Sequence, residues 1–598
     1  MKEIFTMPSQ LEQLVDAVIE TDFLVVGGGL AGCLAALQAK RKNKNIDITI
    51  MEKSTIEYAG SAIGLKDFHI EQEGMIEHPL PDEMDAEQAK KSLFGVNRFK
   101  GMVSSNMAVV ELKNWVKPLA ILEDIGVQIR EDDGTMKGLQ AYRRGTVWGS
   151  LVYDETGKPY APDMVLYRGS DLKTKLARAI RKAGIRVVER TMITSLITKG
   201  ETVVGATGFN MRTGKFILFK AKAIIIATGR ATRMYPYQWA PFPNNLFYSV
   251  GYSGNHGGGI IAALNGGAKV HNMEYIWVYA VSKGSNISSG SGGAGWYFPM
   301  MNSKGEYLEE KYADRNVRKI GGNIPPVNFM YAPSVKDPEI EREVITSIKS
   351  PATDELVTNI YFCAATEQPR SLKFHMLAGG PRNDKPIECI PVCSGLTING
   401  IMRINEYAET SLKNLFAAGD CAGHTAGCRA LAWGFIVGDH VALRVKELEH
   451  QAYGNDQLRQ IEEAKLRTFA PLNRKVEIGV NPLELEDYVR NLNLNYVGVH
   501  KIEPRLKWAV EKLRWVKEEI TPAITASNFH ELMRALEVQD IIELSEMHAQ
   551  TSLMRTESRM PPIHNRDDYP EQDKNWDSIV ITARKIGGVI HYKKEKIQ

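Results

Sequence analysis

The alternation of apolar and polar positions changes period twice near the start of the chain, which predicts a β-α-β unit. An apolar run at residues 22–26 predicts a strand, a glycine cluster follows, and the small residues 33–40 favour a helix. A second apolar run at 46–51 predicts another strand, and it ends at the acidic residue Glu52. We therefore expect two parallel strands joined by a helix at the start of an α/β domain.

Later segments extend this domain and then give way to helices. Charged side chains at helical spacing predict mainly helices beyond about residue 440. Residues 284–295 are rich in Ser and Gly and predict a surface loop. The other expected elements are a helix at 170–182, a strand at 185–188, a hairpin of 203–209 and 215–219 around Thr213-Gly214, a buried strand at 223–228 and a short strand at 415–418.

The composition is that of an ordinary globular protein of several domains. The chain has 598 residues, and 74 basic against 71 acidic side chains leave a net charge of +3, which argues against a nucleic-acid binder. Six cysteines without a CxxC pair argue against a disulfide framework or a bound cluster, so we expect no metal site. The acidic start and the lack of a long apolar run predict neither a secretory leader nor a transmembrane segment, and hence a cytoplasmic protein.

The glycine cluster has the spacing of a dinucleotide-binding turn. Gly27, Gly29 and Gly32 form the pattern GxGxxG between the first strand and the helix. Gly27 permits the tight turn, Gly29 lets the backbone approach a pyrophosphate, and Gly32 lets the helix pack on the strand. Glu52 ends the next strand, where a carboxylate accepts hydrogen bonds from ribose hydroxyls. The alternative is a glycine-rich turn without a ligand.

Two distant segments decide between FAD and NAD. Residues 223–229 predict a strand that ends in Ala227-Thr228-Gly229, and residues 415–420 predict one that ends in Gly419-Asp420. Both segments resemble the secondary signatures of two-dinucleotide-type flavoproteins. In those proteins the Ala-Thr-Gly turn packs near FAD, and the acid binds a ribityl hydroxyl. The resemblance implies that the cofactor is FAD.

Longer stretches resemble the fumarate reductase/succinate dehydrogenase flavoprotein family. One is the glycine-rich run 253–275, and another is the C-terminal run from Arg555-Thr-Glu-Ser-Arg559 to Trp576. Within that family the chain resembles above all the adenylylsulfate reductase alpha subunits, in residues 20–22, 51–53, 208–209, 219–223, 419–423 and 530–535.

This resemblance implies an α/β fold in which a Rossmann-like FAD-binding domain is interrupted by an α+β capping domain and followed by a C-terminal helical domain. The substrate would lie between the cap and the flavin. The implied boundaries are 1–234 and 371–445 for the FAD-binding domain, 235–370 for the cap, 446–576 for the helical domain and 577–598 for a tail.

The motifs and the resemblance together imply which residues hold FAD. They are Gly27, Gly29, Leu30, Ala31, Gly32, Glu52, Lys53, Gly60, Ser61, Gly64, Ala227, Thr228, Gly229, Gly419, Asp420 and Ala430. Relatives that bind FAD covalently use a His shortly after the acid of the second strand, and the matching position here is Tyr58. We therefore expect non-covalent FAD.

Four side chains are candidates for chemistry at the flavin: His375, Arg429, His424 and His69. His375 matches an active-site His of the family, and a pKa near neutrality suits proton transfer or substrate orientation. Arg429 and His424 follow Asp420 in a segment where relatives place an Arg that grips a substrate carboxylate. His69 matches a substrate-pocket position. The alternatives are a loop His without a role, a structural ion pair for Arg429 and simple packing for His69.

Departures from the family leave the substrate open. Residues 276–279 lack the Gln-Phe-His-Pro segment of fumarate reductases, which disfavours fumarate or succinate. The expected function is a catalytic flavoprotein subunit that acts on a small anionic molecule. The resemblance implies a ferredoxin-like iron–sulfur partner in a hetero-oligomer. The alternatives are a stand-alone oxidase or fumarate-linked dehydrogenase similar to L-aspartate oxidase, a non-catalytic electron-transfer flavoprotein, and an adenylylsulfate reductase alpha subunit.

Overall fold

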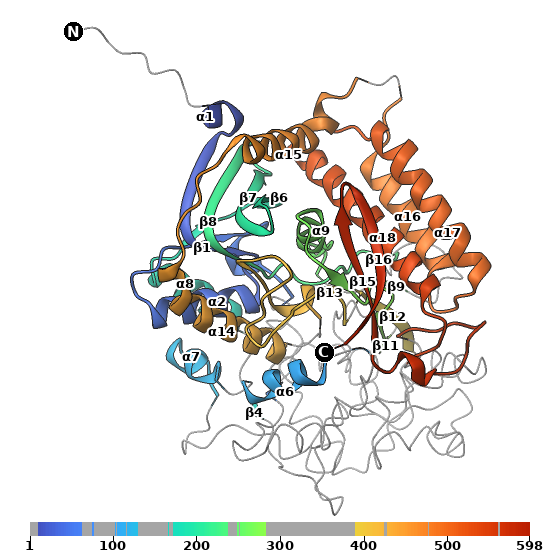
Figure 1. The fold of residues 1–598 in the computed structure, drawn as a ribbon, viewed down its shortest axis with the longest axis horizontal. Coiled ribbons are helices and arrows are strands. Elements are labelled where there is room, and N and C mark those ends of the chain that lie inside the picture. The colour runs from blue at the N-terminus through green and yellow to red at the C-terminus, as the bar shows by residue number, and fades with distance from the viewer. Residues whose placement is uncertain are drawn as a thin grey trace, which may run out of the picture.

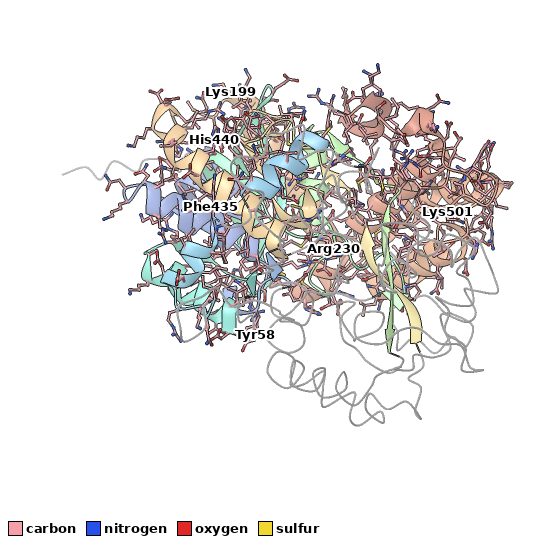
Figure 2. All side chains as sticks on the ribbon, turned by 90° about the horizontal axis from the view of Figure 1, so that it is seen from below. Tyr58, Lys199, Arg230, Phe435, His440 and Lys501 are labelled. Atoms are coloured by element: carbon pink, nitrogen blue, oxygen red, sulfur yellow. The ribbon has the colours of Figure 1, made fainter. Side chains whose placement is uncertain are left out.

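A computed structural model of the chain has two lobes (Figure 1). The described residues are 10–61, 75–76, 102, 104–114, 117–129, 165–166, 171–236, 248–249, 252–282, 389–396, 398–423, 427–475, 478–559 and 563–597. One lobe is built around a large sheet from the N-terminal part, and the other contains the orange and red C-terminal helices. Figure 2 shows Arg230 between the lobes, with Tyr58 at the edge of the first and Lys501 in the second.

The large sheet confirms the predicted β-α-β start. Its strands run in the order β5-β2-β1-β8-β7-β6, with β14 also paired to β8. The pairs of β1 with β2 and β8, of β2 with β5 and of β14 with β8 are parallel, whereas β6, β7 and β8 pair antiparallel. The bounds are β1 (Ala17–Val26), β2 (Ile48–Met51), β5 (Arg186–Val188), β6 (Thr191–Lys199), β7 (Thr202–Asn210), β8 (Phe216–Ile226) and β14 (Leu415–Ala417).

Strand β8 corrects one sequence prediction. The sequence predicts two separate strands, at 215–219 and 223–228, but the structure has one continuous strand. Lys220 and Lys222 do not interrupt it because they occupy alternate positions on the less buried face. Lys222 forms an ion pair with Asp22, with 2.9 Å between Nζ and Oδ1.

Two helices that begin at the same edge of the sheet cross at close range. They are α2 (Leu30–Lys42) and α14 (Gly427–Arg444). A Cβ at Gly434 would lie 2.3 Å from the Ala31 carbonyl oxygen, and one at Gly438 would lie 2.4 Å from that of Ala35. Only glycine allows this approach, which brings both helix N-termini to the carboxyl ends of the parallel strands.

Helix α9 (Gly258–Asn265) moves a predicted domain boundary. The sequence prediction assigns everything after residue 234 to the cap, but Ile260, Ile261 and Leu264 share a core with Ile224 and Ile226 of β8. The run 252–276 therefore packs with the nucleotide-binding sheet. Residues 283–388, most of the expected cap, lie outside the described residues.

Strands that flank the expected cap form smaller sheets. β11 (Ile276–Ser282) pairs with β12 (Cys389–Leu396), which also pairs with β9 (Tyr248–Ser249). Short elements of the first lobe are α1 (Gln10–Leu14), β3 (Met75–Ile76), α6 (Ser105–Lys113), α7 (Leu119–Asp124), β4 (Val165–Leu166) and α8 (Leu172–Lys182).

The second lobe confirms the predicted helical region. Its helices are α15 (Asn455–Asn473), α16 (Pro482–Tyr496), α17 (Glu503–Trp515) and α18 (Phe529–Met554). Helix α18 runs for 26 residues and buries Val538, Ile541 and Leu544 against the first lobe. Among the helices that the structure describes, none is both long and apolar enough to cross a bilayer.

The predicted tail at 577–598 is wrong, because most of it is a β-hairpin. β15 (Ile579–Ile586) and β16 (Val589–Lys596) pair antiparallel, and β15 also pairs with β10 (Val270–His271), which pairs with β13 (Gly400–Ile401). Gly587 and Gly588 have φ of +57° and +83°, as a tight two-residue turn requires. The basic composition obscured a clear hairpin signal.

Candidate active site

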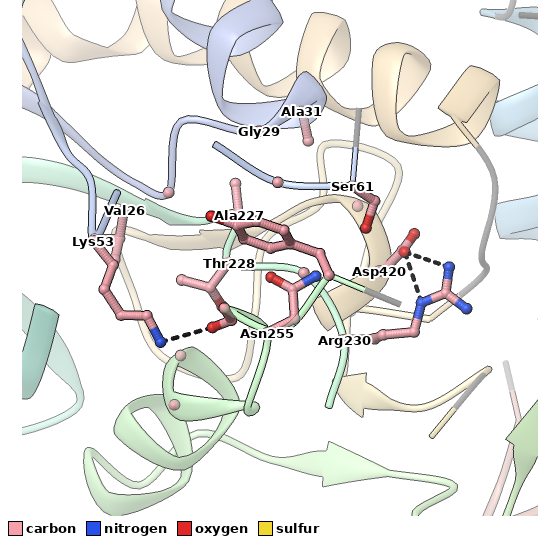
Figure 3. A pocket seen from close by; sticks show the side chains of 18 of the residues that line it. Val26, Gly29, Ala31, Lys53, Ser61, Ala227, Thr228, Arg230, Asn255 and Asp420 are labelled. Carbon is pink, nitrogen blue, oxygen red and sulfur yellow. Dashed lines mark hydrogen bonds and ion pairs between the residues drawn. The ribbon is translucent and has the colours of Figure 1, made fainter. Parts of the chain in front are cut away.

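A crevice lies where the strands β1, β8 and β14 end and the helices α2 and α14 begin (Figure 3). Its lining includes Gly27, Gly29, Leu30, Ala31, Glu52, Lys53, Gly60, Ser61, Ala227, Thr228, Gly229, Gly419, Asp420 and Ala430. The structure thus brings together nearly all of the predicted cofactor residues around one cavity. Gly32 packs directly behind the lining.

The glycine turn has the geometry that a bound pyrophosphate requires. Gly27 has φ of +102°, and a Cβ there would lie 2.5 Å from the Ala227 carbonyl oxygen. A Cβ at Gly32 would lie 1.9 Å from the Gly27 carbonyl oxygen. A Cβ at Gly29 would meet only the Ala227 oxygen, at 4.0 Å. The space in front of Gly29 is therefore open, at the N-terminus of α2, where backbone N–H groups attract anions.

Glu52 fixes this turn from the end of β2. It is buried, and its carboxylate accepts hydrogen bonds from the backbone N–H groups of Gly28 and Ser54, both at 2.6 Å. Carboxylate oxygens accept further hydrogen bonds, so Glu52 keeps capacity for a ribose hydroxyl. Lys173, at the start of α8, donates to the Gly28 carbonyl oxygen at 2.6 Å. Sequence reasoning missed Lys173, which comes from a segment about 145 residues away.

Asp420 faces the crevice together with a cation that the sequence did not reveal. Its Oδ2 accepts from Arg230 Nε at 3.0 Å and lies 2.9 Å from Arg230 Nη2 (Figure 3). Burial raises the pKa of Asp420, and Arg230 opposes that shift. Arg230 follows directly after the Ala227-Thr228-Gly229 turn.

The described lining fits FAD. Within it, the buried hydroxyl of Thr228 has no hydrogen-bond partner, so the crevice offers an unused polar group. The N-terminal turn of α9 adds further backbone N–H groups through Gly257, Gly258 and Gly259, which sequence reasoning did not assign. Open glycine backbone, an acid at the second strand and an orphan hydroxyl match the needs of a dinucleotide.

Lys53 lines the crevice, but its ammonium group belongs to an ion network. Nζ lies 2.6 Å from Oε1 of Glu537 on α18, and it donates to the Gly254 carbonyl oxygen at 2.7 Å. His256 Nδ1 lies 3.0 Å from the same Nζ, and His256 Nε2 lies 3.1 Å from Asp540. Lys53 therefore joins the crevice to the C-terminal lobe.

Arg429 is the one catalytic candidate within the described residues. It lies in the first turn of α14, beside Ala430 of the crevice lining. Its Nε is 3.3 Å from Oε1 of the buried Glu111, whose Oε2 accepts from Trp433 Nε1 at 2.6 Å. Glu111 on α6 thus holds the guanidinium in place, a role that the sequence did not reveal.

Several candidates lie outside the described residues, and the structure adds nothing to them. They are Gly64, His69, His375 and His424. Cys421 is buried, and this burial raises the pKa of its thiol to about 11, so it packs rather than reacts. Nowhere in the described ranges do three His, Cys, Asp or Glu side chains gather as a metal site would require.

The sheet, the glycine turn and the paired acids define an FAD-binding flavoprotein. Residues 22–434 match the family described as FAD binding domain, and residues 487–598 match the fumarate reductase flavoprotein C-terminal domain. The chain therefore belongs to the fumarate reductase/succinate dehydrogenase flavoprotein family and is an FAD-dependent oxidoreductase.

Individual relatives are distant but mostly of full length. An uncharacterised FAD-dependent oxidoreductase of Methanocaldococcus jannaschii is 24% identical over 95% of this chain and 97% of its own. The flavoprotein of the fumarate reductase (CoM/CoB) of Methanothermobacter marburgensis is 23% identical over 95% and 98%. The adenylylsulfate reductase of Archaeoglobus fulgidus has the same fold, with a TM-score of 0.76 at 20% identity over 100% of this chain and 98% of that one.

Proposed function

We propose that this chain is the catalytic flavoprotein subunit of an enzyme that oxidises or reduces a small anionic substrate. The observation that carries the proposal is Arg429, held by buried Glu111 in the first turn of α14 and adjacent to the crevice lining. A guanidinium binds carboxylate or sulfate oxygens through paired N–H donors. The N-terminus of α14 adds a partial positive charge at the same end of the crevice.

Bound FAD, held without a covalent bond, supplies the two-electron chemistry. The chain's own residues bind and orient: Glu52 and Thr228 offer hydrogen bonds to the cofactor, and Arg429 orients the substrate anion. Electrons enter or leave through a ferredoxin-like iron–sulfur partner. Support for a partner comes from relatives that are themselves named as subunits of larger enzymes, including those of the methanogen fumarate reductase and of a succinate dehydrogenase.

The first experiment compares Arg429→Gln with the wild type as FAD-loaded proteins. Viologen-linked and dye-linked turnover is measured with fumarate, succinate, adenylyl sulfate and L-aspartate. We expect the substitution to lower kcat/KM for the active substrate by about 100-fold, because a charge-assisted bidentate contact is lost, while flavin absorbance stays unchanged. Arg459→Gln, on an exposed part of α15, is the matched control. Full turnover in Arg429→Gln would refute the role and favour a non-catalytic electron carrier.

The second experiment tests the partner. The protein is isolated anaerobically from its own host, and its visible spectrum is recorded. Broad iron–sulfur absorption over the flavin bands, with a second polypeptide that co-purifies, is the expected result. A flavin spectrum alone, bleached by substrate and restored by air, would instead identify a stand-alone oxidase.

A further inference from the structure

A second cavity, of about 410 Å³, lies on the far side of the turn that carries Asp420. It is enclosed by the C-terminal sheet, the start of α6 and the backbone of Ala422 and Gly423. It shares no lining residue with the flavin crevice. Its polar lining residues are Ser104, Lys269, His271, Arg403, Ser411, Glu595 and Lys596.

Arg403, just after β13, is the chief cation of this cavity. Its guanidinium carbon lies 4.0 Å from the centroid of the Trp433 ring, so the flat faces stack. Nη2 lies close to Gly423, where an added Cβ would be 3.4 Å away. Burial lowers the pKa of Arg403 to about 10, and the charge of Glu111 opposes that shift. Arg403 therefore stays cationic at neutral pH.

The guanidinium of Arg403 has no hydrogen-bond acceptor among the residues that the structure describes. Stacking on Trp433 satisfies the face of the guanidinium but leaves its five edge donors unused. A largely buried cation without acceptors is costly, and other buried arginines of this chain avoid the cost with carboxylates. Arg233 and Arg555, for example, each bind two glutamates.

The rest of the lining is also more cationic than anionic. Lys269, His271 and Lys596 line the cavity with Arg403, against the single carboxylate of Glu595. Glu595 is itself engaged, because both its oxygens lie 3.0 Å from Lys269 Nζ. An anion that entered would face a net positive field and the open fork of Arg403.

We propose that this cavity is a second binding site, for a small organic anion that carries a carboxylate or phosphate, with Arg403 as its anchor. The volume exceeds what a bare oxyanion needs and falls within the range of small-molecule sites. The occupant would rest against Ala422 and Gly423, the back of the flavin-side turn. The proposal does not depend on Arg429 or on the substrate of the enzyme.

The test uses the FAD-loaded full chain and malonate as the probe. Isothermal titration calorimetry at constant ionic strength compares wild type, Arg403→Gln and the exposed control Arg459→Gln. We expect saturable binding to the wild type and the control, and at least tenfold weaker binding to Arg403→Gln. If Arg403→Gln fails to fold, Arg403→Lys makes the same comparison, because it keeps the charge but loses the fork. Unchanged affinity in the variant that folds, or no saturable binding to the wild type, would overturn the proposal.

Arg429→Gln separates this site from the flavin crevice. We expect it to retain the malonate binding that depends on Arg403. If Arg429→Gln abolishes all binding while Arg403→Gln leaves it intact, the anion site belongs to the crevice and the second site does not exist.

Discussion

The flavin crevice and the junction between the two lobes handle polar groups in opposite ways. The crevice consists mainly of backbone and glycine, and it leaves the hydroxyl of Thr228 without a partner. The junction, only one residue beyond Glu52, is crowded with buried charges that bind one another. The difference shows that open polar groups mark the places meant for a ligand, whereas fully paired ones mark the places that hold the protein together.

Four charged side chains form the centre of the junction. Arg233, at the end of the first lobe, binds both Glu486 of α16 and Glu537 of α18. Arg534 lies 3.0 Å from each of the same two glutamates. Burial alone would raise the pKa of Glu537, but Lys53, Arg233 and Arg534 outweigh it and hold that pKa well below its usual value. The network therefore stays ionised when buried.

Glu537→Gln breaks the junction most severely. The substitution keeps the shape but leaves Lys53 and Arg233 without their shared carboxylate, so we expect a loss of about 3–5 kcal/mol in the free energy of unfolding. Urea unfolding measures it. Glu518→Gln, the same change at an exposed position, is the control and should cost less than about 0.5 kcal/mol. A loss below about 1 kcal/mol for Glu537→Gln would contradict the role of the network.

Gly29→Val should break the crevice without harming the fold. Gly29 has φ of −68° and ψ of −167°, an extended conformation that valine adopts, and the space in front of it is open. We expect at least about 100-fold weaker FAD binding, since the side chain occupies the place of the pyrophosphate. Flavin content and reconstitution of the apoprotein measure it. The melting temperature of the apoprotein should match that of wild-type apoprotein, and normal flavin content would remove the assignment.

Acid should weaken the C-terminal lobe in a defined pH range. His548 is buried between the lobes, with Nδ1 2.8 Å from the Met273 carbonyl oxygen, and burial together with Lys501 lowers its pKa to about 3. The unfolded state binds a proton near pH 6.5, so stability is full above that pH and falls as pH drops toward 3. Between pH 7 and 5 this side chain should cost about 2 kcal/mol. Unfolding at both pH values tests this, and His548→Gln should reduce the difference by about that amount.

Local spacing was enough to find the glycine turn, Glu52 and Asp420, because each motif fixes its own backbone geometry. The partners of these residues could not be found in this way. Lys173, Arg230 and Glu111 reach the site from separate elements, and nothing local marks them. Three-dimensional folding, not sequence distance, decides which cation meets which acid.

Motif resemblance also located segments without revealing what they do. The Arg555-to-Arg559 signature was recognised, yet its role appears only in the structure: Arg555 and Arg559 share the buried Glu557, and Arg555 also binds Glu274. The signature therefore stabilises the lobe rather than the flavin. The C-terminal hairpin was missed for the opposite reason, because its lysines outweighed a regular strand pattern.

That hairpin sets the timing of synthesis. β15 supplies the partner for β10, yet it leaves the ribosome roughly 300 residues later, which corresponds to about 15–60 s of translation. During that interval one edge of β10 has no strand beside it, and exposed edges invite pairing with other chains. The protein completes this sheet only after release, so nascent chains depend on shielding of that edge until the last segment arrives.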